Sequence, residues 1–392
     1  MTTDRTAIRR RLAVRRTAHR PPWGGGKARG HRSIVAPLSA TVAATVAVGI
    51  GLVVARAVME RERRATRAGR SSRQARRFGL RSEETAASGC RRIALGQLDL
   101  AIELLRGESS VPPEEAVHET RKALKRVRAL MRLLEGELGV KRARRERAVL
   151  RDAAARLAGA RDAEVMVSTL DALVKRHPRR LGHRRGVVEL REDLERERRD
   201  ATKRTLGEDV ATRERVAEEL TRVRERVAKW KLSAGRSAVK LTRPGLEHIY
   251  RAGRTGRRRA GKRNAGPGAL HKWRKHVKDL RYGAEVLDVR EPTKGGSKPS
   301  AKRTSKPASR RMAKIARRAD RLGEMLGEEH DLMLLAERVR AHKPLQRRRK
   351  RTRKRLLRAI SRRRARLRKR ALRDGERLYA RKPARFVRNV RA

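Results

Sequence analysis

The amino-acid sequence predicts an all-α protein, on three observations. Apolar residues recur at intervals of three and four residues through most of the chain after residue 88. No stretch of any length alternates apolar and polar residues as a half-buried strand would. A strongly basic amphipathic stretch, residues 117–134, recurs as residues 270–287.

The charge of the chain points to an anionic partner. Its 109 Lys and Arg and 43 Asp and Glu give a net charge of +66 among 392 residues. Such an excess repels itself unless counterions or a polyanion lie nearby. Nucleic acid, an anionic membrane and a polyphosphate all meet this requirement. Aromatic residues make up only 2% of the chain, which argues against recognition of single-stranded bases because that depends on aromatic stacking.

The cysteine content limits the chemistry further. The chain contains one cysteine, Cys90, which excludes an internal disulfide and supplies no thiolate metal cluster. We expect Cys90 to be a small apolar residue within a helix. The sequence predicts neither a bound metal nor a cofactor.

The first 88 residues divide into three segments. Residues 1–33 are basic and interrupted by proline and glycine, which predicts a disordered tail. Residues 34–57 include an almost continuous uncharged run, long enough as a helix to cross a hydrocarbon core of about 30 Å. We expect a transmembrane helix there, with a cleaved signal peptide or a buried segment as alternatives, and cations on both flanks leave its orientation open. Residues 58–88 are predicted to be a basic linker.

The remaining residues, 89–392, are predicted to form one helical domain of two repeats, 89–240 and 241–392. A Lys-, Ser- and Pro-rich stretch near 290–309 lacks periodicity and is predicted to be a disordered loop. The expected helices cover residues 90–106, 117–134, 141–173, a pair within 182–231, 270–287 and 341–370. For the second of these, Ser110, Pro112 and Pro113, followed by two glutamates, predict a helix start ahead of residue 117. The helix 341–370 contains 17 Lys or Arg and no acid, so it presents cations on most of its circumference.

One face of the predicted helix 117–134 is a row of cations headed by a histidine. At 100° per residue, these side chains fall within about 120° of one another. The apolar stripe, which includes Leu124, Val127 and Met131, falls on the opposite side. We call the basic row the first ladder; its members are His118, Arg121, Lys122, Lys125, Arg128 and Arg132.

The ladder is duplicated. A shift of 153 residues brings the second stretch into register with the first, and the apolar stripes match as well. Chance could place a few cations in register in so Arg-rich a chain, but not a histidine and both stripes together. Where Arg126 matches Asp279, we expect both positions to lie off the basic face. The second ladder is His271, Arg274, Lys275, Lys278 and Arg281.

A small residue followed closely by an aspartate comes after each ladder. The two segments are residues 157–162 and residues 325–331. The glycine in each allows a close approach of two helices. We expect Asp162 and Asp331 to pair with ladder cations and hold them in place, which is a supporting rather than a catalytic role.

These motifs resemble those of the CHAD family, the conserved histidine α-helical domain. The resemblance rests on the duplicated ladders, the two aspartate segments, the stretch 244–254 and the tail 378–387, and it extends over about residues 88–392. It implies two antiparallel bundles of about four long helices each, related by a pseudo-twofold axis. It further implies non-catalytic binding of inorganic polyphosphate in a basic groove lined by the ladder residues. His330 departs from the small polar residue usual in the family, and its role is open.

The chemistry of the ladders suits this ligand. Cations one turn apart recur about every 5.4 Å along a helix, a spacing that can follow successive phosphates. Arginine offers bidentate hydrogen bonds to phosphate oxygens, and lysine offers a compact charge. We expect His118 and His271 to lie at the N-terminal ends of their helices, where free N–H groups also favour an anion.

Other functions remain alternatives. A nucleic-acid-binding or compacting protein would make use of the cations in 341–370. A membrane-surface protein would use the same charge to bind anionic lipid. We expect no enzymatic activity, since no nucleophile and base are paired in the sequence. The family resemblance implies a cytoplasmic domain, on polyphosphate granules or anchored to a membrane by residues 34–57, and the oligomeric state is left open.

Overall fold

The structure, a computed structural model, describes residues 78–109, 111–157, 159–203, 210–266, 268–289 and 307–391. The predicted tail 1–33, the predicted membrane span 34–57 and most of the predicted linker and loop lie outside the described residues. No helix of the described part is long and apolar enough to cross a membrane.

The described part of the chain is helical and contains no strand, which confirms the all-α prediction. The helices of the first half are α2 (Ala86–Arg106), α3 (Pro113–Leu133), α4 (Glu135–Leu138), α5 (Val140–Arg156), α6 (Gly159–Arg176), α7 (Pro178–Leu181), α8 (Arg185–Lys203) and α9 (Val210–Ala228). Those of the second half are α10 (Ala238–Ala260), α11 (Ala269–Val286), α12 (Pro307–Ala341), α13 (Lys343–Arg347), α14 (Lys350–Leu378) and α15 (Pro383–Arg391).

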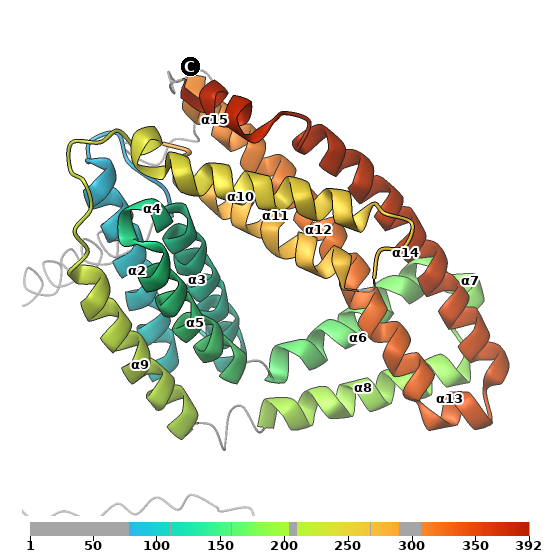
Figure 1. Ribbon diagram of the computed structural model, residues 1–392. Coiled ribbons are helices and arrows are strands. Elements are labelled where there is room, and N and C mark those ends of the chain that lie inside the picture. Colours follow the sequence, from blue (N-terminus) through green and yellow to red (C-terminus); the bar gives the residue numbers. More distant parts are fainter. Residues whose placement is uncertain are drawn as a thin grey trace, which may run out of the picture. The chain divides into compact units, whose positions relative to one another are not determined.

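Each half contributes a group of four packed helices. In the first half α2 packs on α3 and α9, and α5 packs on α3 and α9 (Figure 1). In the second half α10 and α12 each pack on α11 and α14. The ladder helices α3 and α11 also contact each other directly, so they join the two halves.

The hydrophobic cores do not follow the boundary between the repeats. One core contains side chains of α2, α3, α5 and α9 together with α10, α11 and the first part of α12. The other contains α6 and α8 from the first repeat, and the second part of α12 with most of α14 from the second. Because α12 runs through both cores, the repeats are interlocked rather than stacked as independent units.

The predicted helix 141–173 is wrong as a single element. It is divided into α5 and α6, with Leu157 as the C-terminal cap of α5. The break has a packing reason, because Leu150 belongs to the first core whereas Leu170 belongs to the second. In the second repeat, α12 spans both cores without interruption.

The predicted helix 341–370 is also wrong in its boundaries. The helix α12 ends at Ala341, and the Nδ1 of His342 accepts a hydrogen bond of 3.3 Å from the backbone N–H of Leu345, which starts the short α13. The helix α14 begins at Lys350. Pro344 suits the first turn of α13 but cannot continue a longer helix, since it lacks an N–H.

Two predicted irregular segments are shorter than expected. Residues 307–309 of the predicted loop belong to α12. At the end of the predicted linker, Leu80 is buried and its N–H donates to the carbonyl of Val286 at 3.0 Å. Phe78 packs edge-on against Tyr282, with ring centroids 6.0 Å apart. These two apolar residues anchor the end of the predicted linker on α11.

A close approach between α10 and α3 fixes how the halves meet. A Cβ at Gly245 of α10 would lie 2.1 Å from the carbonyl oxygen of Leu133 and 2.6 Å from that of Arg132. Both atoms belong to backbone, which cannot rotate away as a side chain could. Glycine is therefore required at this point of contact.

We predict that Gly245→Ala lowers the free energy of unfolding by about 2 kcal/mol or more, because α10 must move away from α3. Gly283→Ala, on α11, is the matched control, since its Cβ would lie 3.6 Å from Leu133 Cδ1, at ordinary contact distance. The control is expected to be neutral or to stabilise by up to about 1 kcal/mol, as alanine favours helix over glycine. Denaturant unfolding of both variants tests this, and equal effects would contradict it.

Candidate functional site

The two ladders face a common pocket between α3 and α11. The pocket has a volume of about 700 Å³ and also receives side chains of α6 and α12. It contains nine of the eleven predicted ladder residues, which are His118, Arg121, Lys125, Arg128, Arg132, His271, Arg274, Lys275 and Lys278. We call it the ladder pocket. Its remaining lining residues are Val165, Met166, His276, Asp279, Tyr282, His330, Asp331 and Leu334.

Two predicted ladder residues lie outside this lining. The ammonium of Lys122 is 3.0 Å from the carboxylate of Glu119, one turn earlier on α3. Arg281 donates from Nε to Glu285 at 2.7 Å and forms a second ion pair with Asp320. Both residues belong to the basic rows of their helices, but each is paired with nearby carboxylates outside the ladder pocket.

The expectation for Asp279 is wrong. It lies in the pocket wall and forms an ion pair with Arg132 of the first ladder. The expectation for its counterpart holds, since Arg126 lies over the ring of Phe78, 5.0 Å from the centroid. The two positions differ in their partners, since Asp279 reaches across the contact between α11 and α3, whereas Arg126 faces Phe78 and Gln97.

The histidines occupy different places in their helices. His271 is in the first turn of α11, as predicted. His118 is not in the first turn, contrary to the expectation, because α3 begins at Pro113 and His118 is its sixth residue. Only the first four N–H groups of a helix lack an intrahelical partner. Free backbone N–H groups at a helix N-terminus can therefore favour an anion beside His271 but not beside His118.

His271 and His330 form a close pair in the pocket, with ring centroids 4.3 Å apart. Burial, followed by the charges of His330 and neighbouring cations, lowers the pKa of His271 to about 4. Burial and then Arg274 lower the pKa of His330. Both rings are therefore neutral near pH 7, and each can serve as a hydrogen-bond donor or acceptor.

The pKa values of Lys278 and Arg128 are also lowered in this pocket. Burial first, and then Arg274, Lys125 and Arg281, lower the pKa of Lys278 to about 8, while Asp331 acts in the opposite direction. Burial and Arg132 lower the pKa of Arg128. The effect of Lys125 on Lys278 crosses from one ladder to the other, so the ladders form one electrostatic unit.

Several donors in the pocket are not used by the protein. Among the residues that the structure describes, the buried Nε atoms of Arg128 and Arg274 have no hydrogen-bond partner. The same is true of the buried Nδ1 of His271. Buried polar groups in native structures are normally paired, so these three atoms are hydrogen-bonding groups that the protein leaves unused, as are several other buried groups outside the pocket.

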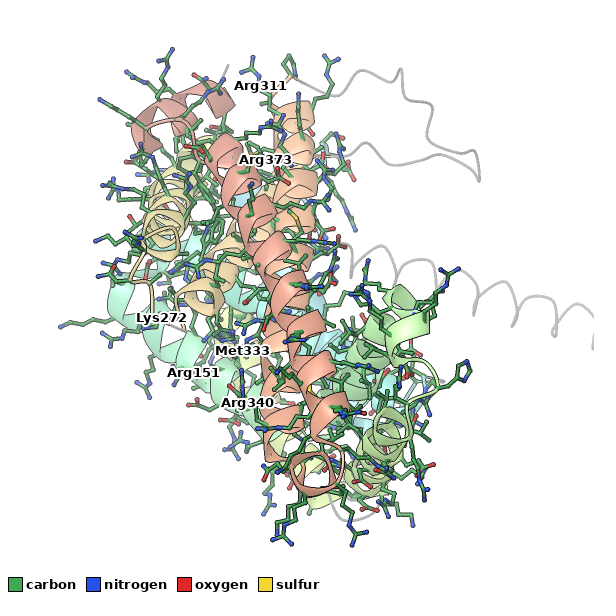
Figure 2. All side chains as sticks on the ribbon, turned by 90° about the vertical axis from the view of Figure 1, so that its right-hand side faces the viewer. Arg151, Lys272, Arg311, Met333, Arg340 and Arg373 are labelled. Atoms are coloured by element: carbon green, nitrogen blue, oxygen red, sulfur yellow. The ribbon has the colours of Figure 1, made fainter. Side chains whose placement is uncertain are left out.

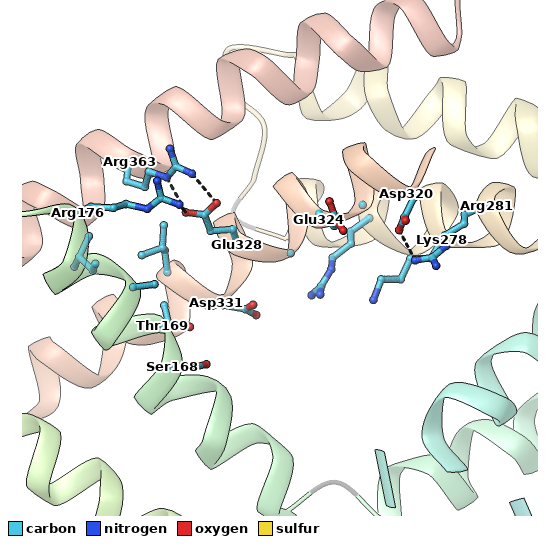
Figure 3. A pocket seen from close by; sticks show the side chains of 16 residues that line it. Ser168, Thr169, Arg176, Lys278, Arg281, Asp320, Glu324, Glu328, Asp331 and Arg363 are labelled. Carbon is cyan, nitrogen blue, oxygen red and sulfur yellow. Dashed lines mark hydrogen bonds and ion pairs between the residues drawn. The ribbon is translucent and has the colours of Figure 1, made fainter. Parts of the chain in front are cut away.

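A second pocket of about 450 Å³ shares Arg274, Lys278 and Asp331 with the ladder pocket. Figure 3 shows the side chains that line this second pocket. Its cations are balanced by acids. Glu328 accepts two hydrogen bonds of 2.7 Å from Arg363 and lies 3.7 Å from Arg176. This pocket is thus nearly neutral, in contrast to the ladder pocket.

Asp331 lines both pockets together with Arg274 and Lys278, and its supporting role stays a prediction. The side chain of Asp162 lies outside what the structure describes. Sequence reasoning missed Arg176, Arg363 and His276. Nothing in the sequence pattern distinguishes Arg176 or Arg363 from their many basic neighbours, whereas His276 could have been found because it lies within the second ladder stretch.

The described residues contain no group of three or more His, Cys, Asp or Glu arranged to hold a metal ion. Cys90 is buried, and burial raises the pKa of its thiol to about 12. It is therefore an unreactive core residue, in line with its expected role.

We predict that Lys278→Met stabilises the unliganded protein. The lowered pKa of Lys278 means that folding disfavours its charged form, so stability is reduced below pH 8 and recovers as the pH rises toward 10.5. At pH 7 the variant should gain about 1 kcal/mol or more, because each tenfold change in a protonation equilibrium corresponds to about 1.4 kcal/mol. Lys272→Met, at an exposed position of the same helix, is the control for loss of one charge. Equal Tm values for the two variants would contradict the burial penalty.

Comparison with known proteins identifies the fold family. The family profile named CHAD domain matches residues 92–291, just over half of the chain. A crystal structure of the CHAD domain from the plant Ricinus communis is similar over 74% of this chain and 87% of that chain, with 15% sequence identity and a TM-score of 0.42. No curated protein matches the chain. The chain therefore belongs to the CHAD domain family, as its duplicated histidine ladders indicated.

Proposed function

We propose that this protein binds inorganic polyphosphate in the ladder pocket, without a chemical step. The observation that carries the proposal is the convergence of nine cationic or histidine side chains from both repeats on one pocket. Acids facing this pocket are few, namely Asp279 and Asp331. The net charge of the lining thus remains strongly positive.

The shape and chemistry of the pocket favour a thin phosphate chain over a nucleic acid. A volume of about 700 Å³ is in the range of small-molecule pockets and far too small for a duplex. Tyr282 is the only Phe, Tyr or Trp in the lining, so there is no series of aromatic platforms for bases. The guanidinium groups of Arg128 and Arg274, which line the pocket, are suited to donate to phosphate oxygens.

Two hydroxyl groups near the site are engaged in helix contacts. Ser168 and Thr169 line the second pocket, and their hydroxyls donate to the carbonyl of Val165 at 3.0 Å and 2.6 Å. Neither is held against a histidine or carboxylate that would activate it as a nucleophile. This arrangement supports binding rather than phosphoryl transfer. Attachment to a granule, or to a membrane through residues 34–57, stays a prediction of the sequence.

We predict that a pocket variant loses most of its polyphosphate affinity. The variant combines Arg121→Glu, Lys125→Glu, Arg274→Glu and Lys275→Glu, which places repulsive charge on both ladders. At about 0.1 M salt, we expect the Kd for long-chain polyphosphate to rise by about 100-fold or more, corresponding to about 3 kcal/mol. Fluorescence anisotropy with labelled polyphosphate measures this.

The matched control reverses four exposed cations of α5, with Lys141→Glu, Arg142→Glu, Arg144→Glu and Arg145→Glu. It makes the same change in net charge away from the pocket, so its Kd should change by less than about fivefold, an effect of long-range potential alone. For the parent protein, affinity should fall steeply as salt rises, by analogy with counterion release. Equal losses in the two variants, or affinity independent of salt, would contradict the proposed function.

We also predict a pH dependence that arises from Lys278. A bound polyanion favours the charged ammonium, so the pKa of Lys278 should rise from about 8 in the free protein when ligand binds. Binding above pH 8 then requires proton uptake, and affinity should fall as the pH increases from 8 to 9.5. Lys278→Arg stays charged across this interval and should reduce the dependence. A profile unchanged by this substitution would show that Lys278 does not titrate on binding.

A further inference from the structure

The outer face of α14 carries a second row of cations, separate from the ladder pocket. On the wheel of this helix, the row falls within about 120°, opposite the buried residues Leu356, Ile360 and Leu367. It extends over about 27 Å at 1.5 Å per residue. We call this row the α14 stripe, and it comprises the exposed residues Arg351, Lys354, Arg355, Arg358, Arg362, Arg366 and Lys369.

Cations on the inner flanks of the same helix are paired with acids. Arg363 binds Glu328, and Arg364 donates to Glu329 at 2.7 Å. Within the described part of the chain, no member of the α14 stripe forms an ion pair. Figure 2 shows α14 running along the face turned toward the viewer, with Arg373 labelled beside it. The inner cations hold α14 in place, whereas the stripe is available to a partner.

The exposed helix α8 provides a comparison, because its surface cations are paired with acids. On α8, Arg191 pairs with Asp171 at 2.8 Å, and Arg198 pairs with Glu195 at 3.0 Å. There, exposed cations alternate with acids that neutralise them. The α14 stripe differs from α8 in that its exposed face carries charges of one sign along its whole length.

We propose that the α14 stripe binds the phosphate backbone of double-stranded nucleic acid, independently of sequence. Duplex DNA carries about one negative charge per 1.7 Å of its axis, so a 27 Å row faces many phosphates at once. The row is straight and exposed, which suits a stiff polyanion with a persistence length of about 50 nm. Five of its members are arginine, which binds phosphate oxygens in bidentate fashion.

Polyphosphate and membranes fit this surface less well. A flexible chain laid on an open, convex row loses conformational freedom and gains contacts on one side only, whereas the ladder pocket surrounds it. Interfacial membrane helices need an exposed apolar face, but the large apolar residues of α14 are buried in the two cores or packed against them. The inference goes beyond the proposed function, because it assigns a second ligand to a different surface.

The test uses the full-length protein with Arg351→Glu, Arg355→Glu, Arg358→Glu and Arg362→Glu together. Binding of a labelled duplex of about 20 base pairs is followed by anisotropy between about 50 and 200 mM salt, the range in which counterion release is visible. We expect affinity at about 0.1 M salt to fall at least about tenfold, and the slope of log K against log salt to decrease by about 3.6, that is 0.9 for each of four lost contacts. The α5 control carries the same change in net charge and should keep both values close to those of the parent.

Parallel titrations with polyphosphate and with phosphatidylserine vesicles separate the partners. The α14 variant should retain polyphosphate binding, and the pocket variant should retain duplex binding. The inference is overturned if the α14 variant binds duplex as the α5 control does, or if it loses polyphosphate or vesicle binding in place of duplex binding. Polyphosphate binding by the pocket variant reports separately on the proposed function, so either idea can fail without the other.

Discussion

The central physical constraint on this structure is the repulsion among the cations that line the ladder pocket. Lys278 and Arg128 have lowered pKa values because burial and neighbouring cations disfavour their charged forms. Only two acids line this pocket, and one of them, Asp279, pairs with Arg132 across the helix interface. The cations of the free pocket therefore repel one another, and a bound polyanion would relieve this repulsion. Such a ligand would stabilise the folded state by a free energy that rises with the logarithm of its concentration relative to its Kd.

The rest of the fold opposes this repulsion through hydrophobic burial. On α3, Leu124 and Val127 are fully buried behind the ladder, and on α11 Trp273, Val277 and Leu280 take the same place. Both ladder helices thus lie between a core and a cationic pocket. The cores cross from one repeat to the other, and α12 runs through both of them. This shared hydrophobic packing, together with the ion pair between Asp279 and Arg132, holds the two ladders beside each other.

The register of both ladders could be predicted from sequence because it depends only on helical periodicity, which is a local property. The all-α class followed from the same signal. The differences between the predictions and the structure concern contacts between helices. Asp279 pairs with Arg132 of α3, and Arg281 pairs with Asp320 of α12, so both depend on which helices pack against α11. The division of α5 from α6 reflects membership of two cores, which no local pattern of apolar residues specifies.

The central claim is that the two ladders bind one ligand together rather than one ligand each. Calorimetric titration with a short polyphosphate tests this most directly, because it measures the number of binding sites per chain. The parent protein is compared with two variants, each altered in a single ladder. One carries Arg121→Glu and Lys125→Glu, and the other carries Arg274→Glu and Lys275→Glu. The account predicts one high-affinity site per chain, and loss of that site in either variant. Two sites per chain, with one retained when either ladder is disabled, would contradict it.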